Sequence, residues 1–537
     1  MNKKRIFILT VVLCIMVIAL PTALAATTVE NIDSQTPIDG NYGFSFKWID
    51  GVTTAVPLNM PNDEGCLSIR KEEMKVNTVC TTLSDSVKGR SGIRYNNVGS
   101  YNGTDVDLKV TVIDWTSLNP KEDNESFYAL TSNIAFYISR IDNIKLKFQF
   151  LKHGTDTPLN IKGYITLDDL DYNQYFEFDT SSAIVKQYLA EGNNFITYSN
   201  KRFQSKYEEV NNQGNGKLDG LVMTMFKGNY MELVFGEKAE DDHRASGAYF
   251  GFTADVLGRF TLPEPSKSVN KKEVLDTEKF EYTVSQLVPH SAESDYYNSF
   301  TFKDTINSYL VAPTSNQITV TNELKQNVTS KFNISVSGQT ITAEALKTEL
   351  EKQDFYEHTY TFKFPVYLSP SAPNNLFVDN GKYQVKNFGN FLRTTKTKAT
   401  QETSQTNEVT TDIKRKATIK YVVVGATPPA DLTDKLPADE TKYIGDSYEI
   451  KPGLTTTYKD QKCTFNGWYK EEALKNKANG SYVLEGDTTL YGAWTCANTV
   501  VVPKTAAQTP LIILGVGLLS VATGIGFYIR KTKKKNN

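Results

Sequence analysis

Short runs of alternating apolar and polar residues recur from Asn41 onward in this 537-residue chain, and they constrain its fold more than any other feature. Examples of strand length are YGFSFKWI, VDLKVTVIDW, IKLKFQFL, IKGYITL and YMELVFG. Because successive side chains of a β-strand point to opposite faces of the sheet, a period of two indicates strands with one buried face. Turn signals such as Asn102-Gly103 separate such runs. Only Ala183–Ala190 and Ala343–Gln353 have a helix-like pattern. The sequence therefore predicts an all-β protein.

The two ends of the chain have the composition of export and membrane segments. Residues 1–25 have a basic start, an apolar stretch and a final Ala-Leu-Ala, which predicts a secretory signal peptide. Residues 511–529 are apolar and uncharged, about the ~20 residues that a transmembrane helix needs. The basic tip that follows predicts a cytoplasmic C-terminus, so everything before the span is expected outside the cell.

A short motif precedes this apolar span. Its residues are Val502, Pro503, Lys504, Thr505 and Ala506. The motif, the span and the basic tip within 497–537 together resemble the sorting signal of Gram-positive cell-wall proteins, although that family usually has Leu and Gly at the two ends of the motif. In that family a sortase cleaves after the Thr and joins it to the peptidoglycan precursor. The resemblance implies a wall-anchored protein that is cleaved between Thr505 and Ala506, with a plain membrane anchor as the alternative.

Charge and cysteine content narrow the class further. The net charge of −2 and the pI near 6.2 argue against a nucleic-acid-binding surface. Four cysteines lie outside the signal peptide, in two local pairs, which in an exported protein predicts the disulfides Cys66–Cys80 and Cys463–Cys496. The four histidines are scattered singly, so no metal site is expected from them.

Residues 26–262 are predicted to form an N-terminal β-sandwich. Val98–Trp115 and Gly163–Phe176 within it resemble the N-terminal sandwich of some Gram-positive surface adhesins, which implies binding of a protein or carbohydrate ligand. We expect no cofactor. Calcium is a minor alternative at two polar loops, since its ligands are oxygen atoms of this kind. The residues concerned are Asp168, Asp169, Asp171 and Asn173, and the segment 211–220.

Pro263-Glu264-Pro265 opens a second unit, predicted to span 263–413. The segments PSKSV, YTV, FTFKDT and SQTNEV, in this order, resemble the isopeptide-forming β-sandwich domains of fimbrial and other Gram-positive surface proteins. In that family a first-strand Lys bonds covalently to an Asn on the last strand, assisted by an acidic residue. The resemblance implies Lys267 as the nucleophile, Asn407 as the acceptor and Asp304 as the acid.

The chemistry of such a bond explains why these residue types are needed. Burial disfavours charge, so it lowers the pKa of a lysine and raises that of a carboxyl group. A neutral amine can then attack an amide whose carbonyl a protonated acid polarises. Lys271 and Lys272 are alternative nucleophiles, although their charged surroundings favour exposure, and Glu344 and Asp379 are alternative acids.

Residues 417–496 contain FNGW and LYGAWT. These motifs resemble the repeat of Listeria internalin-type and Bacteroides surface proteins, which implies a small β-grasp-like unit that serves as a stalk. Trp468 and Trp494 are expected in its core rather than in a ligand platform.

Taken together, the sequence predicts tandem β-sandwiches, a small repeat and a wall anchor. The function we expect is that of a non-enzymatic cell-surface adhesin whose partners are a sortase, the peptidoglycan precursor and an extracellular protein or glycan. An accessory pilus subunit is the alternative. A surface-displayed glycosidase is less favoured, because no catalytic motif is recognisable.

Overall fold

The computed structural model describes residues 29–69, 77–118, 125–168, 170–179, 184–208, 218–238, 248–424, 436–454 and 463–496. The predicted signal peptide and the whole segment 497–537 lie outside this part of the chain. Within it, no helix has the length and hydropathy needed to cross a bilayer. The described residues divide into two compact units, and the second comprises those within 420–439, 449–480 and 489–496.

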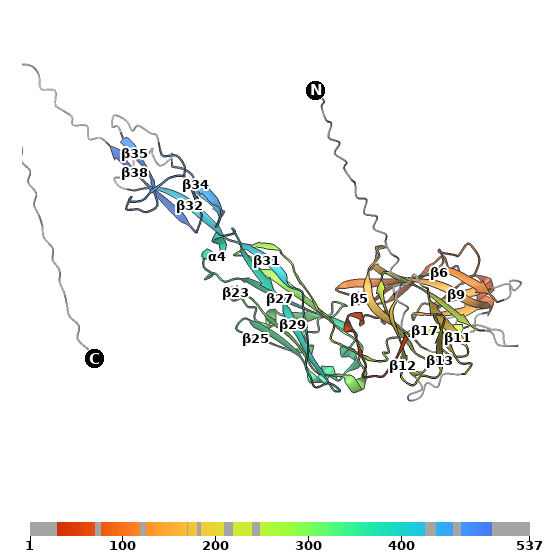
Figure 1. Cartoon of the computed structure of the whole chain (residues 1–537). Coiled ribbons are helices and arrows are strands. Elements are labelled where there is room, and N and C mark those ends of the chain that lie inside the picture. Colours follow the sequence, from red (N-terminus) through yellow and green to blue (C-terminus); the bar gives the residue numbers. More distant parts are fainter. Residues whose placement is uncertain are drawn as a thin grey trace, which may run out of the picture. The chain divides into compact units, whose positions relative to one another are not determined.

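The first unit begins with two eight-stranded sheets, seen in the red-to-yellow part of Figure 1. In sheet order, the first contains β1 (Val29–Ile32), β12 (Ile184–Ala190), β15 (Val222–Gly228), β10 (Ile161–Asp168), β17 (Ala248–Thr253), β8 (Ala135–Ser139), β7 (Ser126–Leu130) and β4 (Thr78–Thr82). The second contains β13 (Ile196–Ser199), β14 (Arg202–Ser205), β11 (Gln174–Phe178), β16 (Tyr230–Glu237), β9 (Ile141–Lys152), β6 (Thr104–Ser117), β5 (Gly92–Tyr101) and β3 (Thr54–Leu58).

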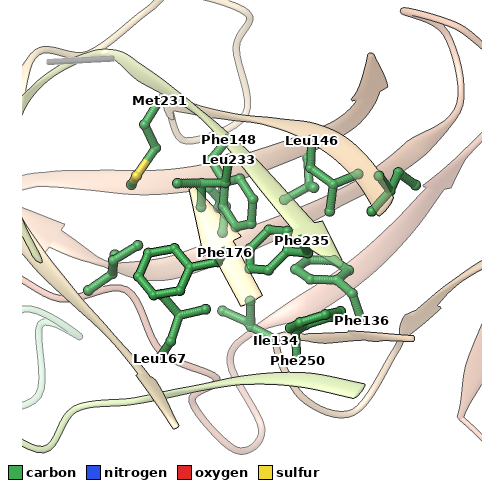
Figure 2. Close-up of a cluster of buried hydrophobic side chains, with 14 of the residues drawn as sticks. Ile134, Phe136, Leu146, Phe148, Leu167, Phe176, Met231, Leu233, Phe235 and Phe250 are labelled. Atoms are coloured by element: carbon green, nitrogen blue, oxygen red, sulfur yellow. The ribbon is translucent and has the colours of Figure 1, made fainter. Parts of the chain in front are cut away.

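The core of this N-terminal sandwich follows from the alternation in its strands. In β9, Leu146 and Phe148 are fully buried, while the alternating Lys145 and Lys147 lie on the other face and are half-buried. Figure 2 shows Leu146 and Phe148 packed with Phe235 of β16 among other buried apolar side chains. The predicted all-β class is confirmed here, because period-two patterning gives each strand one apolar face.

The middle domain packs three smaller sheets. One contains β19 (Ser266–Val269), β21 (Phe280–Val288), β27 (His358–Leu368) and β23 (Leu310–Val311), with β24 (Thr319–Thr321) also paired to β27. The second contains β20 (Glu273–Leu275), β31 (Val409–Lys414) and β28 (Tyr383–Asn387). The third contains β25 (Phe332–Ser337), β26 (Thr340–Ala345), β22 (Tyr297–Thr305), β29 (Gly389–Thr395) and β30 (Glu402–Gln405).

The remaining elements are short. Among the described residues, the helices and 3₁₀ turns are η1 (Gly40–Tyr42), α1 (Glu64–Ile69), η3 (Glu293–Asp295), η4 (Ser315–Gln317), η5 (Thr329–Lys331), α3 (Lys347–Leu350), η6 (Gln353–Phe355) and α4 (Asn375–Val378). Outside the main sheets, β2 (Pro37–Ile38) pairs with β18 (Arg259–Phe260). After the middle domain come β32 (Lys416–Val423), β33 (Glu440–Tyr443), β34 (Ser447–Glu449), β35 (Cys463–Tyr469), β36 (Lys477–Ala478), β37 (Ser481–Val483) and β38 (Thr488–Cys496).

Both helix-like predictions need correction. Ala183–Ala190 is not a helix, because Ile184–Ala190 forms β12 and pairs with β1 and β15. Its β-branched start, Ile184-Val185, suits a strand, and sheet pairing outweighs a weak local helix preference. In Ala343–Gln353, the first residues complete β26, and only Lys347–Leu350 is α-helical.

The N-terminal sandwich and the middle domain touch through charged side chains. Glu357, which precedes β27, accepts hydrogen bonds from Lys47 Nζ at 3.0 Å and pairs with His290 Nδ1 at 2.6 Å. The Glu357 side chain is 19% exposed. Arg393 of β29 is almost fully buried and donates to the Phe260 carbonyl. These two residues tie the sandwiches together within the first unit.

In the second unit, β35 pairs with β36 and β38. Trp468 is buried and packs against Phe465 and Tyr421, both with ring centroids at 4.8 Å. Trp494 is half-buried against Phe465. Trp468 is therefore a core residue, as the sequence predicted, and Trp494 also packs within the unit.

Candidate functional site

Lys267 lies inside the middle domain, which is unusual for a lysine. It is the second residue of β19, whose neighbours Ser266 and Ser268 face outward, so the alternation turns the lysine inward. Its side chain is fully buried. Nζ lies 4.5 Å from the centre of the Tyr282 ring and 5.4 Å from that of Phe364. An amine in such a place needs a polar partner or must lose its charge.

Two polar side chains meet this amine. Asp304 Oδ2, from β22, contacts Nζ, and its side chain is also fully buried. Asn387 Oδ1, from the last residue of β28, contacts Nζ as well. Gly389 lies beside them, where a Cβ would stand 3.0 Å from Asp304 Oδ2 and 2.9 Å from the Phe302 ring. The glycine leaves the space that the carboxyl group occupies.

Burial opposes charge on both members of the Lys267–Asp304 pair. Desolvation lowers the pKa of Lys267, and the Asp304 charge only partly offsets it. Desolvation likewise raises the pKa of Asp304 against the opposing effect of Lys267. The phenol of Tyr282 also has its pKa raised, first by burial and then by the charge of Asp304. Burial therefore shifts the pKa of each group toward its neutral form.

Three polar atoms at the site lack a hydrogen-bond partner of good geometry: Asp304 Oδ1, Asn387 Nδ2 and the Tyr282 hydroxyl. Asn387 is nevertheless close enough to Asp304 to lower the pKa of that carboxyl group. Buried polar groups without partners are rare in folded proteins. One of the three, Asn387 Nδ2, is the group that would leave if the lysine amine attacked the Asn387 carbonyl.

The predicted acceptor, Asn407, lies beside Lys267 but not at its amine. Its Oδ1 accepts from the Lys267 backbone N–H at 2.8 Å, and its Nδ2 donates to the Lys267 carbonyl at 2.9 Å. Asn407 stands in the bend between β30 and β31, whereas Asn387 ends a strand in the inward phase of its alternation. The asparagine side chain at the Lys267 amine is thus Asn387 and not Asn407, and the inward phase of β28 is the sequence signal that could have identified it.

The alternative residues lie elsewhere. Lys271 and Lys272 are exposed, as their charged surroundings indicated. Glu344 and Asp379 are also exposed, so neither reaches the buried amine. Among the acids considered, Asp304 alone has the position that the chemistry requires.

The other sequence-based site predictions have different outcomes. The disulfide Cys66–Cys80 is present, with a Cα–Cα distance of 6.3 Å, and is confirmed. Cys463 and Cys496 stand opposite each other in the register of β35 and β38, but their side chains lie outside the described part of the chain. The sorting motif 502–506 and the segment 211–217 also lie outside it.

Calcium at the loop after β10 stays an untested alternative. Asp168, Asp171 and Asn173 are described, but Asp169 is not. Across the described ranges, no group of three or more His, Cys, Asp or Glu side chains is arranged to hold a metal ion.

Residues 261–413 match the family described as cell surface antigen I/II C2 terminal domain. This range contains every residue of the Lys267 cluster. The middle domain is thus similar to a domain of cell-surface antigens, which is consistent with an extracellular protein of the adhesin or pilin type. No curated protein matches the chain significantly.

Several solved structures are similar to this chain at low sequence identity. The N-terminal domain of the Streptococcus gordonii adhesin Sgo0707 is 12% identical, covers 72% of this chain and 100% of its own, and has a TM-score of 0.30. The Bacillus cereus major pilin BcpA is 10% identical over 62% of this chain and 98% of its own, with a TM-score of 0.26. Domains D2 and D3 of the Corynebacterium diphtheriae pilin SpaD are 12% identical over 46% and 79%, with a TM-score of 0.25. At these scores the likeness does not bear on individual residues.

Proposed function

We propose that this chain is a cell-surface adhesin whose middle domain locks itself with an amide bond between Lys267 and Asn387. The observation that carries the proposal is the contact of a fully buried lysine amine with both an aspartate and an asparagine side chain. Such a buried arrangement has a high cost in desolvation and little value for stability without a further role. Bond formation supplies that role.

The reaction needs no cofactor. The Lys267 ammonium transfers a proton to the Asp304 carboxylate, which leaves a neutral amine and a protonated acid. The Nζ lone pair attacks Cγ of Asn387, and Asp304 carries one proton from Nζ to Nδ2. The bond between Cγ and Nδ2 then breaks, ammonia leaves, and an amide joins the two side chains. The amine is held in contact with the amide, so proximity supplies much of the rate. The event occurs once for each chain, without turnover.

The bond would change how the domain bears tension. It joins β19 to β28, which are separated by 120 residues in the chain. Force entering through β19 would pass directly into β28 and bypass the strands between them. The last strand, β31, pairs antiparallel with β28 and parallel with β20. Its hydrogen bonds to these two neighbours would become the weakest link of the path to the C-terminal side.

The rest of the proposal rests on the sequence. Residues 26–262 bind an extracellular protein or glycan, residues 417–496 extend the stalk, and a sortase joins Thr505 to the peptidoglycan precursor after export. The same locked domain suits an accessory pilus subunit, which differs in being joined to a polymer. Recovery of the protein in a ladder of covalent multimers would favour that alternative over a single anchored chain.

Intact mass of the full-length protein tests the bond directly. After reduction of disulfides, we expect the wild-type chain to be lighter than its sequence by one ammonia, and the Lys267→Ala and Asn387→Ala variants to have their full masses. Peptide mapping should recover one branched peptide containing both residues. A folded wild-type protein of full mass would overturn the proposed bond, and a branched peptide containing Asn407 would overturn the choice of acceptor.

A further inference from the structure

We infer that Thr406 and Asn407 form a positioning clamp, which holds the backbones of the two reacting segments so that the amine of Lys267 meets the amide of Asn387. This inference rests on the proposed bond and adds two residues that would touch neither the amine nor the reacting carbonyl. The clamp is one dipeptide in the bend between β30 and β31.

Asn407 holds the nucleophile strand. β19 is an edge strand that pairs with β21 on one side only. On its other side the carboxamide of Asn407 accepts from the Lys267 N–H at 2.8 Å and donates to the Lys267 carbonyl at 2.9 Å. These are the two hydrogen bonds that a neighbouring strand would make. The Asn407 side chain thereby replaces a neighbouring strand at Lys267, whose position decides the reaction.

Thr406 holds the acceptor segment. Its backbone N–H donates to the Gly389 carbonyl at 2.9 Å, and its Oγ1 accepts from the Gly389 N–H at 3.0 Å. Gly389 is two residues beyond Asn387, at the start of β29. Thr406 is buried, whereas Asn407 is exposed. Both reacting residues are therefore fixed, through their backbones, to consecutive residues of one bend.

A clamp of this kind affects the rate because the amine must stay in line with the amide carbon. Freeing one strand edge lets Lys267 shift relative to Asn387, and a displacement of about 1 Å from the reactive geometry costs about 10²-fold in rate. The environment of the amine is made by Tyr282, Phe364 and Asp304. The Asn407 carboxamide bonds instead to the backbone of Lys267. Removing the clamp should therefore slow the reaction without changing its pH dependence.

The test is the rate of bond formation in the full-length chain. Protein that is made and kept denatured is refolded in mild detergent, quenched with acid at intervals, and scored by intact mass for loss of ammonia. We expect Asn407→Ala to slow the loss by about tenfold or more, with the pH midpoints of the rate unchanged. Asn298→Ala is the matched control, because Asn298 Nδ2 also donates to a backbone carbonyl of this domain, that of Thr395, at 3.0 Å.

Each outcome decides the inference. Equal rates for wild type and Asn407→Ala would overturn the clamp while leaving the bond intact. A shift of the pH midpoints would mean that the substitution acts on the charge environment instead, and would also overturn it. If Asn407→Ala does not refold, Thr406→Val, which removes the hydroxyl acceptor of Gly389 and keeps the side-chain shape, decides by the same criterion. A wild-type chain that loses no ammonia would refute the proposed bond itself, a result distinct from all of these.

Discussion

The side-chain oxygen of Asn387 contacts the amine of Lys267 across the interior of the middle domain, although 120 residues separate the two in the chain. Asp304 contacts the same amine from a third strand. A first-strand lysine, a central-strand acid and an asparagine next to the last strand thus converge at one buried point.

Loss of the bond should lower stability by an amount set by the loop it closes. In Asn387→Ala the unreacted Lys267 amine still has Asp304 as its partner, so loss of the cross-link is the main change. A loop of this length corresponds to about 5 kcal/mol in the chain-entropy account used for disulfides. Denaturant unfolding of the wild-type and variant chains measures the difference. Equal midpoints for a bonded wild type and the unbonded variant would contradict this account.

Asp304 should control both the rate and its pH dependence. Its raised pKa keeps it protonated at higher pH than usual, and the lowered pKa of Lys267 makes the amine neutral at lower pH than usual. The reactive pair holds one proton in total. Acid adds a second proton and alkali removes the only one, so the rate should be bell-shaped in pH.

Asp304→Asn should slow ammonia loss by about 10²-fold, within the usual range for general acid–base catalysis. The refolding assay measures both, and a rate independent of pH would argue against proton transfer by Asp304.

Glu357 should make the first unit sensitive to acid. Burial alone would raise its pKa, but His290 and Lys47 outweigh that effect and hold the pKa at about 2, below its ordinary value of 4.5. A depressed folded pKa adds stability above the unfolded pKa, and this stability is lost as pH falls from about 4.5 toward about 2. This shift of the Glu357 pKa corresponds to about 3 kcal/mol of unfolding free energy. Glu357→Gln should be less stable than wild type at pH near 7, with the gap closing below pH about 4. Urea unfolding across this range tests the sign.

The Cys66–Cys80 disulfide should stabilise the N-terminal sandwich. It closes a loop with a sequence separation of 14 and ties α1 to β4. The double variant Cys66→Ser, Cys80→Ser should lose about 3 kcal/mol of unfolding free energy, the value expected for a loop of this size. Wild type measured with and without reductant should reproduce the loss. Variants of the middle domain, such as Asn387→Ala, should respond to reductant as wild type does.

Local patterning alone determined much of this protein. Period-two alternation predicted the β-class and turned residues such as Leu146 and Phe148 inward, because side-chain direction along a strand depends only on neighbouring residues. Charge content of the surroundings likewise separated exposed Lys271 and Lys272 from buried Lys267. The pairing of Cys66 with Cys80 could also be predicted from the sequence, since few residues separate them.

Only the tertiary structure decided which asparagine meets the amine. Alternation says that Asn387 points inward, but it does not say which strand β28 faces, because strand pairing across long separations is set by the packing of whole sheets. Asn407 is near Lys267 as the family resemblance implied, yet its bend places the carboxamide on the backbone of β19. The same long-range pairing made Ile184–Ala190 a strand, since bonds to β1 and β15 outweigh a weak local preference for helix.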